Sequence, residues 1–311
     1  MHQQHTALVF PGQGSQKVGM AASFANNPVA RPLFEEADDT LKFNLTQLML
    51  EGEESDLALT ENTQPALLLA GVAALKVLED ESERYAHEIA AYTAGHSLGE
   101  YTALVAAGVL RFDDALRLVR KRGQAMQAAV PAGEGKMAAI LGLDVEQVRA
   151  LADEAGVYIA NDNAEGQIVL SGKAENIENA CAMAKDAGAR RAVELPVSAP
   201  FHSPLVADAA DVMADAFGAV TFNQHQVPVV SNIKAEAVEH ATDWPELLKE
   251  QITGTVRWRE SMVYLAEREV TTLLELGSGK VLTGLARRCD KRLSASALQT
   301  VDDIKNTLKP E

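Results

Sequence analysis

The stretch IAAYTAGHSLG, residues 89–99, joins an apolar run to a segment with helical periodicity. It predicts a short strand over 89–94, a sharp turn and a helix over 98–107. In a strand–turn–helix of the G-x-S-x-G type the glycines relieve crowding, and the serine hydroxyl, here that of Ser97, projects at the start of the helix. A serine at this place can also be an ordinary N-cap, and only strand, turn and helix together favour a nucleophile.

Strand-like and helix-like segments alternate on both sides of this turn. Further strands are predicted at 7–10, 227–230 and 271–276, and further helices at 66–78 and 113–129. This alternation is typical of an α/β sheet with helices on its faces rather than of a helical bundle or a β-sandwich. We therefore expect an α/β fold.

The segment at 133–198 has its own order of predicted strands and helices. Its predicted elements are a strand at 136–141, a helix at 145–155, strands at 157–160 and 167–171, a helix at 175–187 and a strand at 191–195. This β-α-β-β-α-β order is the ferredoxin-like one. We expect a large subdomain of residues 1–132 and 199–311, a ferredoxin-like small subdomain at 133–198, and a cleft between them that could hold a substrate. The polar chain after Leu293 is expected to be peripheral.

The composition excludes several classes of protein. Of 311 residues, 28 are Lys or Arg and 44 are Asp or Glu, which gives a formal net charge of −16. Binding of nucleic acid needs clustered cations, so it is not expected. Hydrophobic residues make up 47% of the chain and charged residues 23%, which is typical of a globular protein and not of a disordered one.

Cysteine content and hydropathy indicate the cellular compartment in which the protein is expected. Cys181 and Cys289 are too few for a disulfide framework, so a reducing compartment is expected. The most apolar stretch, 65–75, has about half of the roughly 20 residues that a membrane-spanning helix needs. Residues 1–5 lack the features of a secretory signal. We expect a cytoplasmic protein without a membrane segment.

A serine nucleophile needs a base, and His202 is the best candidate among the seven histidines. It lies in SAPFHSP, residues 198–204, where two prolines can hold an imidazole still. His96, next to the serine, would face another way in such a turn. A surface histidine or a hydrogen-bonded core histidine is the alternative interpretation of His202.

Other motifs do not complete a site. Gly12-Gln13-Gly14 begins like a dinucleotide fingerprint, but Lys17 stands at the third glycine position. The pair 279–280 resembles the end of a phosphate-binding loop whose other residues are missing. Neither H-E-x-x-H nor C-x-x-C occurs, so we expect no metal and no bound cofactor.

Several motifs occur in an order typical of one known family. They are FPGQGSQ at 10–16, GHSLGEY at 95–101, KRGQAM at 121–126, SAPFH at 198–202, QITGTVRW at 251–258 and LGSG at 276–279. The set resembles that of malonyl-CoA:acyl carrier protein transacylases, the free-standing acyltransferases of bacterial fatty acid synthesis. The resemblance covers essentially the whole chain and implies a hydrolase-like α/β sheet with a ferredoxin-like insert.

The resemblance also implies roles for individual residues. Ser97 would be the nucleophile and His202 the base of a dyad rather than a triad, with the imidazole oriented by the backbone carbonyl of Gln251. The backbone N–H groups of Gln13 and Leu98 would form the oxyanion hole. No catalytic role is assigned to Asn161, Asn163 or Gln167.

Arg122 would bind the free carboxylate of a malonyl group. A guanidinium can hold a carboxylate through two parallel hydrogen bonds, whereas an acetyl group would leave the charge unpaired. The alternative is a solvated helix charge, because Arg117, Arg120 and Lys121 precede it in a charged run. In related domains a phenylalanine close before the histidine, here Phe201, accompanies use of malonyl rather than methylmalonyl.

The implied activity is transfer of malonyl from malonyl-CoA to the phosphopantetheine thiol of acyl carrier protein through a malonyl-serine, which supplies fatty acid elongation. Ping-pong kinetics are expected. Three alternatives stay open: a serine esterase or thioesterase, a free-standing polyketide-type acyltransferase, and a catalytically silent subunit that binds carrier protein. Hydrolases with this turn usually carry their histidine late in the chain, whereas more than a hundred residues follow His202.

The expected partners are coenzyme A thioester and acyl carrier protein, and the chain is expected to be a monomer. Two acidic proteins repel each other, so docking would need a local basic patch. The candidate residues are Lys185, Arg190, Arg191, Arg287, Arg288 and Lys291.

Overall fold

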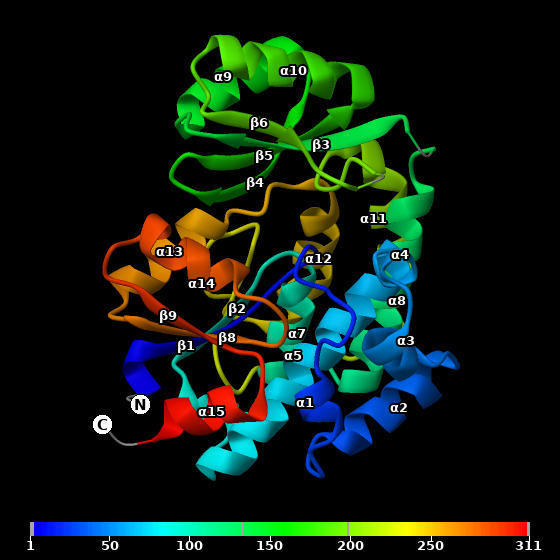
Figure 1. The fold of residues 1–311 in the computed structure, drawn as a ribbon, viewed down its shortest axis with the longest axis vertical. Helices are drawn as coiled ribbons and strands as arrows, with labels where there is room; N and C mark the ends of the chain where they lie inside the picture. The colour runs from blue at the N-terminus through cyan, green and yellow to red at the C-terminus, as the bar shows by residue number, and fades with distance from the viewer. Residues whose placement is uncertain (1–2, 132, 198, 310–311) are drawn as a thin grey trace.

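The computed structural model describes residues 3–131, 133–197 and 199–309. Figure 1 shows a larger body built on a five-stranded parallel sheet and a smaller body built on a four-stranded antiparallel sheet. The strands are β1 (Thr6–Phe10), β2 (Tyr92–Gly95), β3 (Gly135–Leu141), β4 (Tyr158–Ala164), β5 (Gln167–Lys173), β6 (Arg191–Glu194), β7 (Val229–Val230), β8 (Thr272–Leu276) and β9 (Ser294–Leu298).

Helices cover both faces of the parallel sheet, whose strand order is β7-β2-β1-β8-β9. Leu8 and Phe10 of β1 pack into the core with α5 and α7, whereas Ala7 and Val9 pack with α13 and α14 on the opposite face. The helices of this body are α1 (Ala22–Ala25), α2 (Arg31–Leu41), α3 (Leu45–Glu51), α4 (Glu54–Leu57), α5 (Thr60–Ser82), α6 (Ala86–Ile89), α7 (Leu98–Ala106), α8 (Phe112–Ala128), α11 (Ala207–Phe217), α12 (Trp244–Thr253), α13 (Trp258–Glu267), α14 (Val281–Cys289) and α15 (Val301–Leu308). A strand buried on both faces is a continuous apolar run, which explains why β1 was predictable.

The small body has the predicted ferredoxin-like topology. Its sheet has the order β4-β5-β3-β6 with antiparallel pairing throughout. Helices α9 (Val145–Ala155) and α10 (Ala174–Asp186) cover one face through a separate apolar core that includes Ile140, Leu151 and Ile177. The predicted α/β fold with a ferredoxin-like insert is confirmed.

Strand β4 fastens the small body to the large one. The N–H of Val256 donates to the carbonyl of Ala160 at 2.9 Å, and the N–H of Asp162 donates back to the carbonyl of Val256 at 3.0 Å. The guanidinium of Arg259 donates to both carboxylate oxygens of Asp162. Because backbone and side-chain bonds act together here, the two bodies have a defined relative position (Figure 1).

One predicted strand boundary and the expected position of the tail were wrong. Ile89 ends α6 instead of beginning a strand, because residues 86–89 form a helical turn that the Glu88 carboxylate caps at the backbone N–H of Tyr85. An apolar run cannot by itself distinguish a buried helical turn from a strand. The tail after Leu293 is less peripheral than expected, since it supplies β9 and α15.

The proposed domain boundaries remain predictions. They fall beside Ala132 and Ser198, which lie outside the described residues.

Candidate active site

The turn between β2 and α7 is a tight nucleophile elbow. Ser97 has φ 53° and ψ −109°, a strained backbone conformation for a residue with a side chain. A Cβ atom on Gly95 would lie 1.8 Å from the carbonyl oxygen of Gly99, and one on Gly99 would lie 2.1 Å from that of Phe10. Only glycine fits at both positions, so the two glycines are required for the elbow and the serine is lifted into the cleft.

The predicted serine and histidine meet directly. The Oγ of Ser97 lies 2.7 Å from Nε2 of His202, and Nδ1 of His202 lies 2.8 Å from the backbone oxygen of Gln251. His202 is only 5% exposed and has φ 57°. Its loop is held by the Ser203 hydroxyl, which donates to the carbonyl of Pro200 at 2.6 Å. The alternative of a surface histidine is therefore wrong.

The imidazole is neutral in this setting. Burial, together with the positive charge of Arg122, lowers the pKa of His202 to about 3. The neutral ring donates from Nδ1 to the carbonyl of Gln251, which leaves Nε2 as an acceptor for the Ser97 hydroxyl proton. This is the tautomer that a general base needs.

Arg122 lies beside the dyad and not on a helix surface. Its side chain is 2% exposed, and Nη2 donates to Ser97 Oγ at 3.1 Å. The two other acceptors are amide oxygens, that of Gln64 at 2.9 Å and that of Gln251 at 2.8 Å. Arg117, by contrast, forms exposed ion pairs with two aspartates of its own helix. The helix-surface interpretation of Arg122 is wrong, because the side chain is buried, and the acceptors of its hydrogen bonds carry no charge.

A cavity of about 360 Å³ opens onto these groups. Its lining includes all of Gln13, Ser97, Leu98, Arg122 and His202, together with an apolar wall. Within the described part of the chain, the backbone N–H groups of Gln13 and Leu98 donate to no other protein group. Two backbone donors without partners therefore line the same cavity as the serine hydroxyl.

Comparison with known proteins agrees with this geometry. The acyl transferase domain family matches residues 7–304. The malonyl CoA-acyl carrier protein transacylase of Bacillus subtilis (strain 168) is 45% identical over 314 aligned residues, which cover 98% of each chain. The chain belongs to the malonyl CoA-acyl carrier protein transacylase family. It is an acyltransferase by that membership, and the resemblance of the motifs is confirmed.

Solved structures extend the likeness to the transacylase fold. An acyl-carrier-protein-S-malonyltransferase from Bartonella henselae superposes with a TM-score of 0.95 at 44% identity, with 99% of this chain and 98% of that chain covered. A malonyl-transacylase solved in complex with a type II PKS acyl-carrier protein superposes with a TM-score of 0.94 at 41% identity, with 98% and 99% covered. Both comparisons span the two bodies of this chain.

Three polar residues of the transacylase site were missed by the sequence analysis: Gln64, Glu100 and Asn232. Asn232 accepts a hydrogen bond from the N–H of Ser97 and donates one to the carbonyl of Gly95, each at 2.7 Å. It therefore holds the elbow from both sides. A polar residue two positions after a buried parallel strand, here β7, is the signal that could have identified it, since such strand ends line the site in α/β folds.

The amide residues left without a role contact the site in different ways. Asn161 lines the cavity. His96 also lines the cavity, but its Nε2 lies 2.7 Å from Oδ1 of Asn163 and not beside Ser97 Oγ. Gln167 accepts a hydrogen bond from Arg288 at the far end of the β4–β5 hairpin.

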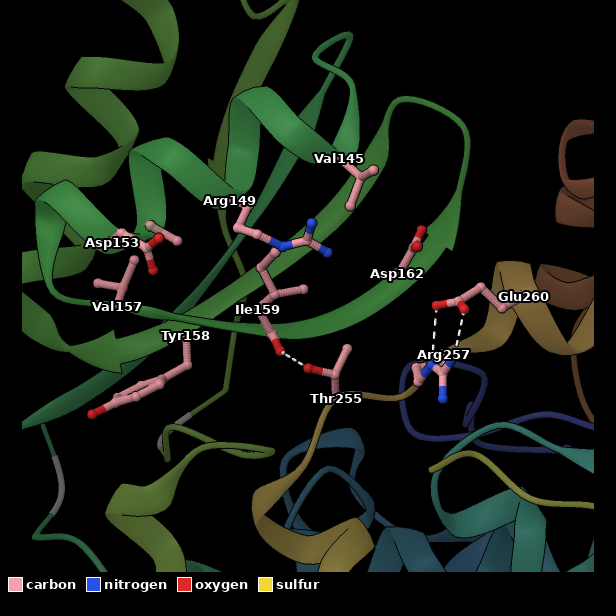
Figure 2. Close-up of a pocket in the computed structure, with 11 residues that line it drawn as sticks. Val145, Arg149, Asp153, Val157, Tyr158, Ile159, Asp162, Thr255, Arg257 and Glu260 are labelled. Carbon is pink, nitrogen blue, oxygen red and sulfur yellow. Dashed lines mark hydrogen bonds and ion pairs between the residues drawn. The ribbon is translucent and has the colours of Figure 1, made fainter. Parts of the chain in front are cut away.

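A second cavity of about 360 Å³ lies between α9 and β4 on one side and residues 255–260 on the other, as Figure 2 shows. Four of the five charged residues labelled in it form ion pairs: Arg257 with Glu260, Arg149 with Glu146, and Asp162 with Arg259. This cavity therefore belongs to the junction between the two bodies.

Residues 3–131, 133–197 and 199–309 hold neither a metal-binding cluster nor a membrane-spanning helix. They contain no cluster of three or more histidine, cysteine or acidic side chains that could hold a metal ion. Within the same ranges, no helix is long and apolar enough to cross a membrane.

Proposed function

We propose that this chain transfers a malonyl group from malonyl-CoA to the phosphopantetheine thiol of an acyl carrier protein, through a malonyl ester on Ser97. The observation that carries the proposal is the position of Arg122. A buried guanidinium whose hydrogen-bond acceptors are two amide oxygens and a hydroxyl lies 3.1 Å from the hydroxyl of a serine–histidine pair. Such a site suits an acyl group that carries its own negative charge.

The first half-reaction forms the ester. His202 Nε2 takes the proton of the Ser97 hydroxyl as Oγ attacks the thioester carbonyl carbon. The N–H groups of Gln13 and Leu98 then stabilise the tetrahedral oxyanion. When the C–S bond breaks, the imidazolium returns its proton to the sulfur of coenzyme A, which leaves as the thiol. The backbone carbonyl of Gln251 keeps the ring oriented throughout.

The second half-reaction is the same chemistry in reverse. The pantetheine thiol gives its proton to His202 and attacks the ester carbonyl, and Ser97 leaves with that proton. Arg122 holds the malonyl carboxylate in both halves. Two successive transfers through one covalent intermediate give ping-pong kinetics.

The test is mass spectrometry of the protein after exposure to malonyl-CoA. We expect a malonyl adduct on the peptide that contains Ser97, and no adduct in Ser97→Ala. Ser82→Ala, at the end of α5 and outside the cavity, is the matched control and retains the adduct. An adduct that persists in Ser97→Ala would refute the assignment of the nucleophile.

A hydrolase with the same elbow would behave differently in one assay. Release of coenzyme A from malonyl-CoA is measured with and without a pantetheine thiol. An acyltransferase releases a single equivalent without the acceptor and turns over with it, whereas an esterase or thioesterase turns over in water alone.

We infer that the carrier protein docks on cations near the turns of the small sheet. Arg190 approaches Gly142 closely, and the N–H of Gly142 donates to the carbonyl of Gly166. Arg288 of α14 donates to the carbonyl of Glu165 beside this glycine. Cations from both bodies thus gather on one edge of an otherwise acidic protein. The relative solved with an acyl-carrier protein supports a partner of this kind.

The remaining expectations are kept as proposals. We propose that residues 133–198 form one structural unit, and that the enzyme acts as a cytoplasmic monomer without a bound cofactor. Sedimentation at assay concentration tests the monomer.

A further inference from the structure

Glu100, in the first turn of α7, is a fully buried carboxyl group that the proposed acyl transfer does not use. Its Oε1 accepts a hydrogen bond from the backbone N–H of Asn232, and its Oε2 accepts one from Nε2 of Gln251, each at 2.6 Å. Burial raises the pKa of this group, whereas the hydrogen bonds from Asn232 and Gln251 and the charge of Arg122 favour the ionised form, in which both oxygens accept. A carboxyl group so costly to bury calls for a local reason.

The Glu100 carboxylate fixes the orientation of the Gln251 amide. Nε2 of Gln251 donates to Glu100 and also to the carbonyl of Ser97 at 2.9 Å. The other end of the amide, Oε1, therefore faces Arg122 and accepts from its Nη2 at 2.8 Å. A reversed amide would point N–H groups at a guanidinium and an oxygen at two other oxygens.

The same arrangement orients Arg122 without neutralising it. Both glutamines that hold the guanidinium, Gln64 and Gln251, offer neutral oxygens. A carboxylate bonded directly to Arg122 would hold it as firmly but would compete with the carboxylate of the acyl group. Glu100 instead makes its direct hydrogen bonds to Asn232 and Gln251, so it orients Arg122 through the Gln251 amide and acts on its charge only without a direct hydrogen bond.

We propose that Glu100 is a positioning residue for acyl-group selection: it fixes the Gln251 amide so that Arg122 is aimed at a carboxylate-bearing acyl group with its charge intact. The proposal rests on the proposed function, in which Arg122 binds the malonyl carboxylate.

The isosteric variant Glu100→Gln breaks this arrangement in a defined way. A glutamine has one oxygen where the carboxylate has two, and the backbone N–H of Asn232 cannot turn away from it. The new amide therefore presents its N–H groups to Gln251, which must reverse. The reversed Gln251 then turns a donor toward Arg122 and loses its bond to the carbonyl of Ser97.

The experiment compares kcat/KM for malonyl-CoA and for acetyl-CoA in the full-length protein. In Glu100→Gln we expect the malonyl value to fall ~10- to 100-fold and the acetyl value to change less than ~3-fold, because only malonyl uses the charge of Arg122. The matched control is Glu275→Gln, which alters another buried carboxylate that accepts backbone N–H bonds, from Leu282 and Thr283. Its malonyl-to-acetyl ratio stays at the wild-type value.

A parallel fall of both substrates in Glu100→Gln would mean a merely structural role and would overturn the proposal. If that variant does not fold, neutron diffraction of the wild-type protein decides: deuterium on the Gln251 atom that faces Glu100 supports the proposal, and deuterium on the atom that faces Arg122 refutes it. The proposed function and this inference can be refuted independently of each other. A wild-type protein that forms no malonyl-serine sinks the proposed function, whereas a malonyl-serine with an unchanged ratio in Glu100→Gln sinks this inference alone.

Discussion

The Nδ1 of His202 donates to the backbone oxygen of Gln251 at 2.8 Å, so the group that orients the imidazole carries no charge. In a serine–histidine–aspartate triad a carboxylate stabilises the imidazolium. Here a peptide carbonyl takes its place, and its hydrogen bond raises the pKa of the ring by less than burial and the nearby Arg122 lower it. The base is therefore well oriented and only weakly basic in the resting protein.

This depressed pKa makes folding stability depend on pH. In the unfolded chain His202 takes up a proton as pH falls below its ordinary value of 6.5, whereas in the folded protein it stays neutral down to about pH 3. Stability is therefore fully present above pH 6.5 and is lost as pH falls, by about 1.4 kcal/mol per pH unit within that window. Urea unfolding of the wild type and of His202→Gln between about pH 6 and pH 4 measures the difference. Equal pH slopes in the two proteins would contradict the assignment.

Gln251→Ala separates the main chain of this residue from its side chain. The carbonyl that orients His202 remains, while Arg122 and Ser97 lose an amide partner. We expect labelling of Ser97 by a small uncharged serine reagent to continue within ~5-fold of the wild-type rate, and malonyl transfer to fall ~10-fold or more. Loss of serine labelling in a folded variant would show that the side chain, and not the carbonyl, sustains the dyad.

Arg122→Ala removes the proposed binding group for the malonyl carboxylate. We expect kcat/KM for malonyl-CoA to fall ~100-fold or more, and the ratio of acetyl to malonyl transfer to rise. Arg117→Ala, on the exposed face of the same helix, serves as control and leaves both values near wild type. An unchanged ratio in Arg122→Ala would remove the carboxylate-binding role.

Gly99→Ala tests the close packing of the elbow. The added methyl group would lie 2.1 Å from the carbonyl oxygen of Phe10 on the central strand, so the helix must shift away from the sheet. We expect a loss of about 3 kcal/mol or more in the free energy of unfolding. Gly284→Ala in α14 adds a methyl group with no atom within 4 Å and is expected to stabilise by up to about 1 kcal/mol. Denaturant unfolding of both variants gives the comparison.

Arg190→Glu tests the docking surface. We expect the KM for acyl carrier protein to rise ~5-fold or more at low salt, and the KM for malonyl-CoA to stay the same, because a charge at the rim acts mainly on encounter with the acidic partner. Arg31→Glu, at the start of α2, makes the same change of net charge and should affect neither value. If both variants raise the carrier KM equally, net charge and not a patch is responsible.

The sequence predicted those parts of the fold and site that depend on neighbouring residues. The elbow at Ser97 follows from a local pattern of glycines, and strand β1 follows from a continuous apolar run. The environment of Arg122 could not be predicted this way, because its amide partners Gln64 and Gln251 lie 58 and 129 residues away in the chain. From composition alone Arg122 is one more cation in a charged helix.

Dependence on distant segments also explains why the role of Glu100 was missed. Glu100 stands in a motif that was noticed, yet its partners Asn232 and Gln251 come from two other segments that only the fold brings together. Ile89 was predicted to lie in a strand because a buried helical turn and a buried strand can both appear in the sequence as a short apolar run.

The uncharged hydrogen-bond partners of Arg122 have a consequence for the catalytic cycle of the enzyme. Among the described residues no carboxylate is hydrogen-bonded to this buried cation, so the acyl group would bring the first one into direct contact with it. In the malonyl-serine form the charge of Arg122 is paired directly with the acyl carboxylate, whereas in the resting protein it has no such direct partner. This ion pair stabilises the acyl-enzyme relative to the enzyme with an empty cavity. Such a difference suits a transferase, because the acyl-enzyme must persist until a carrier thiol arrives.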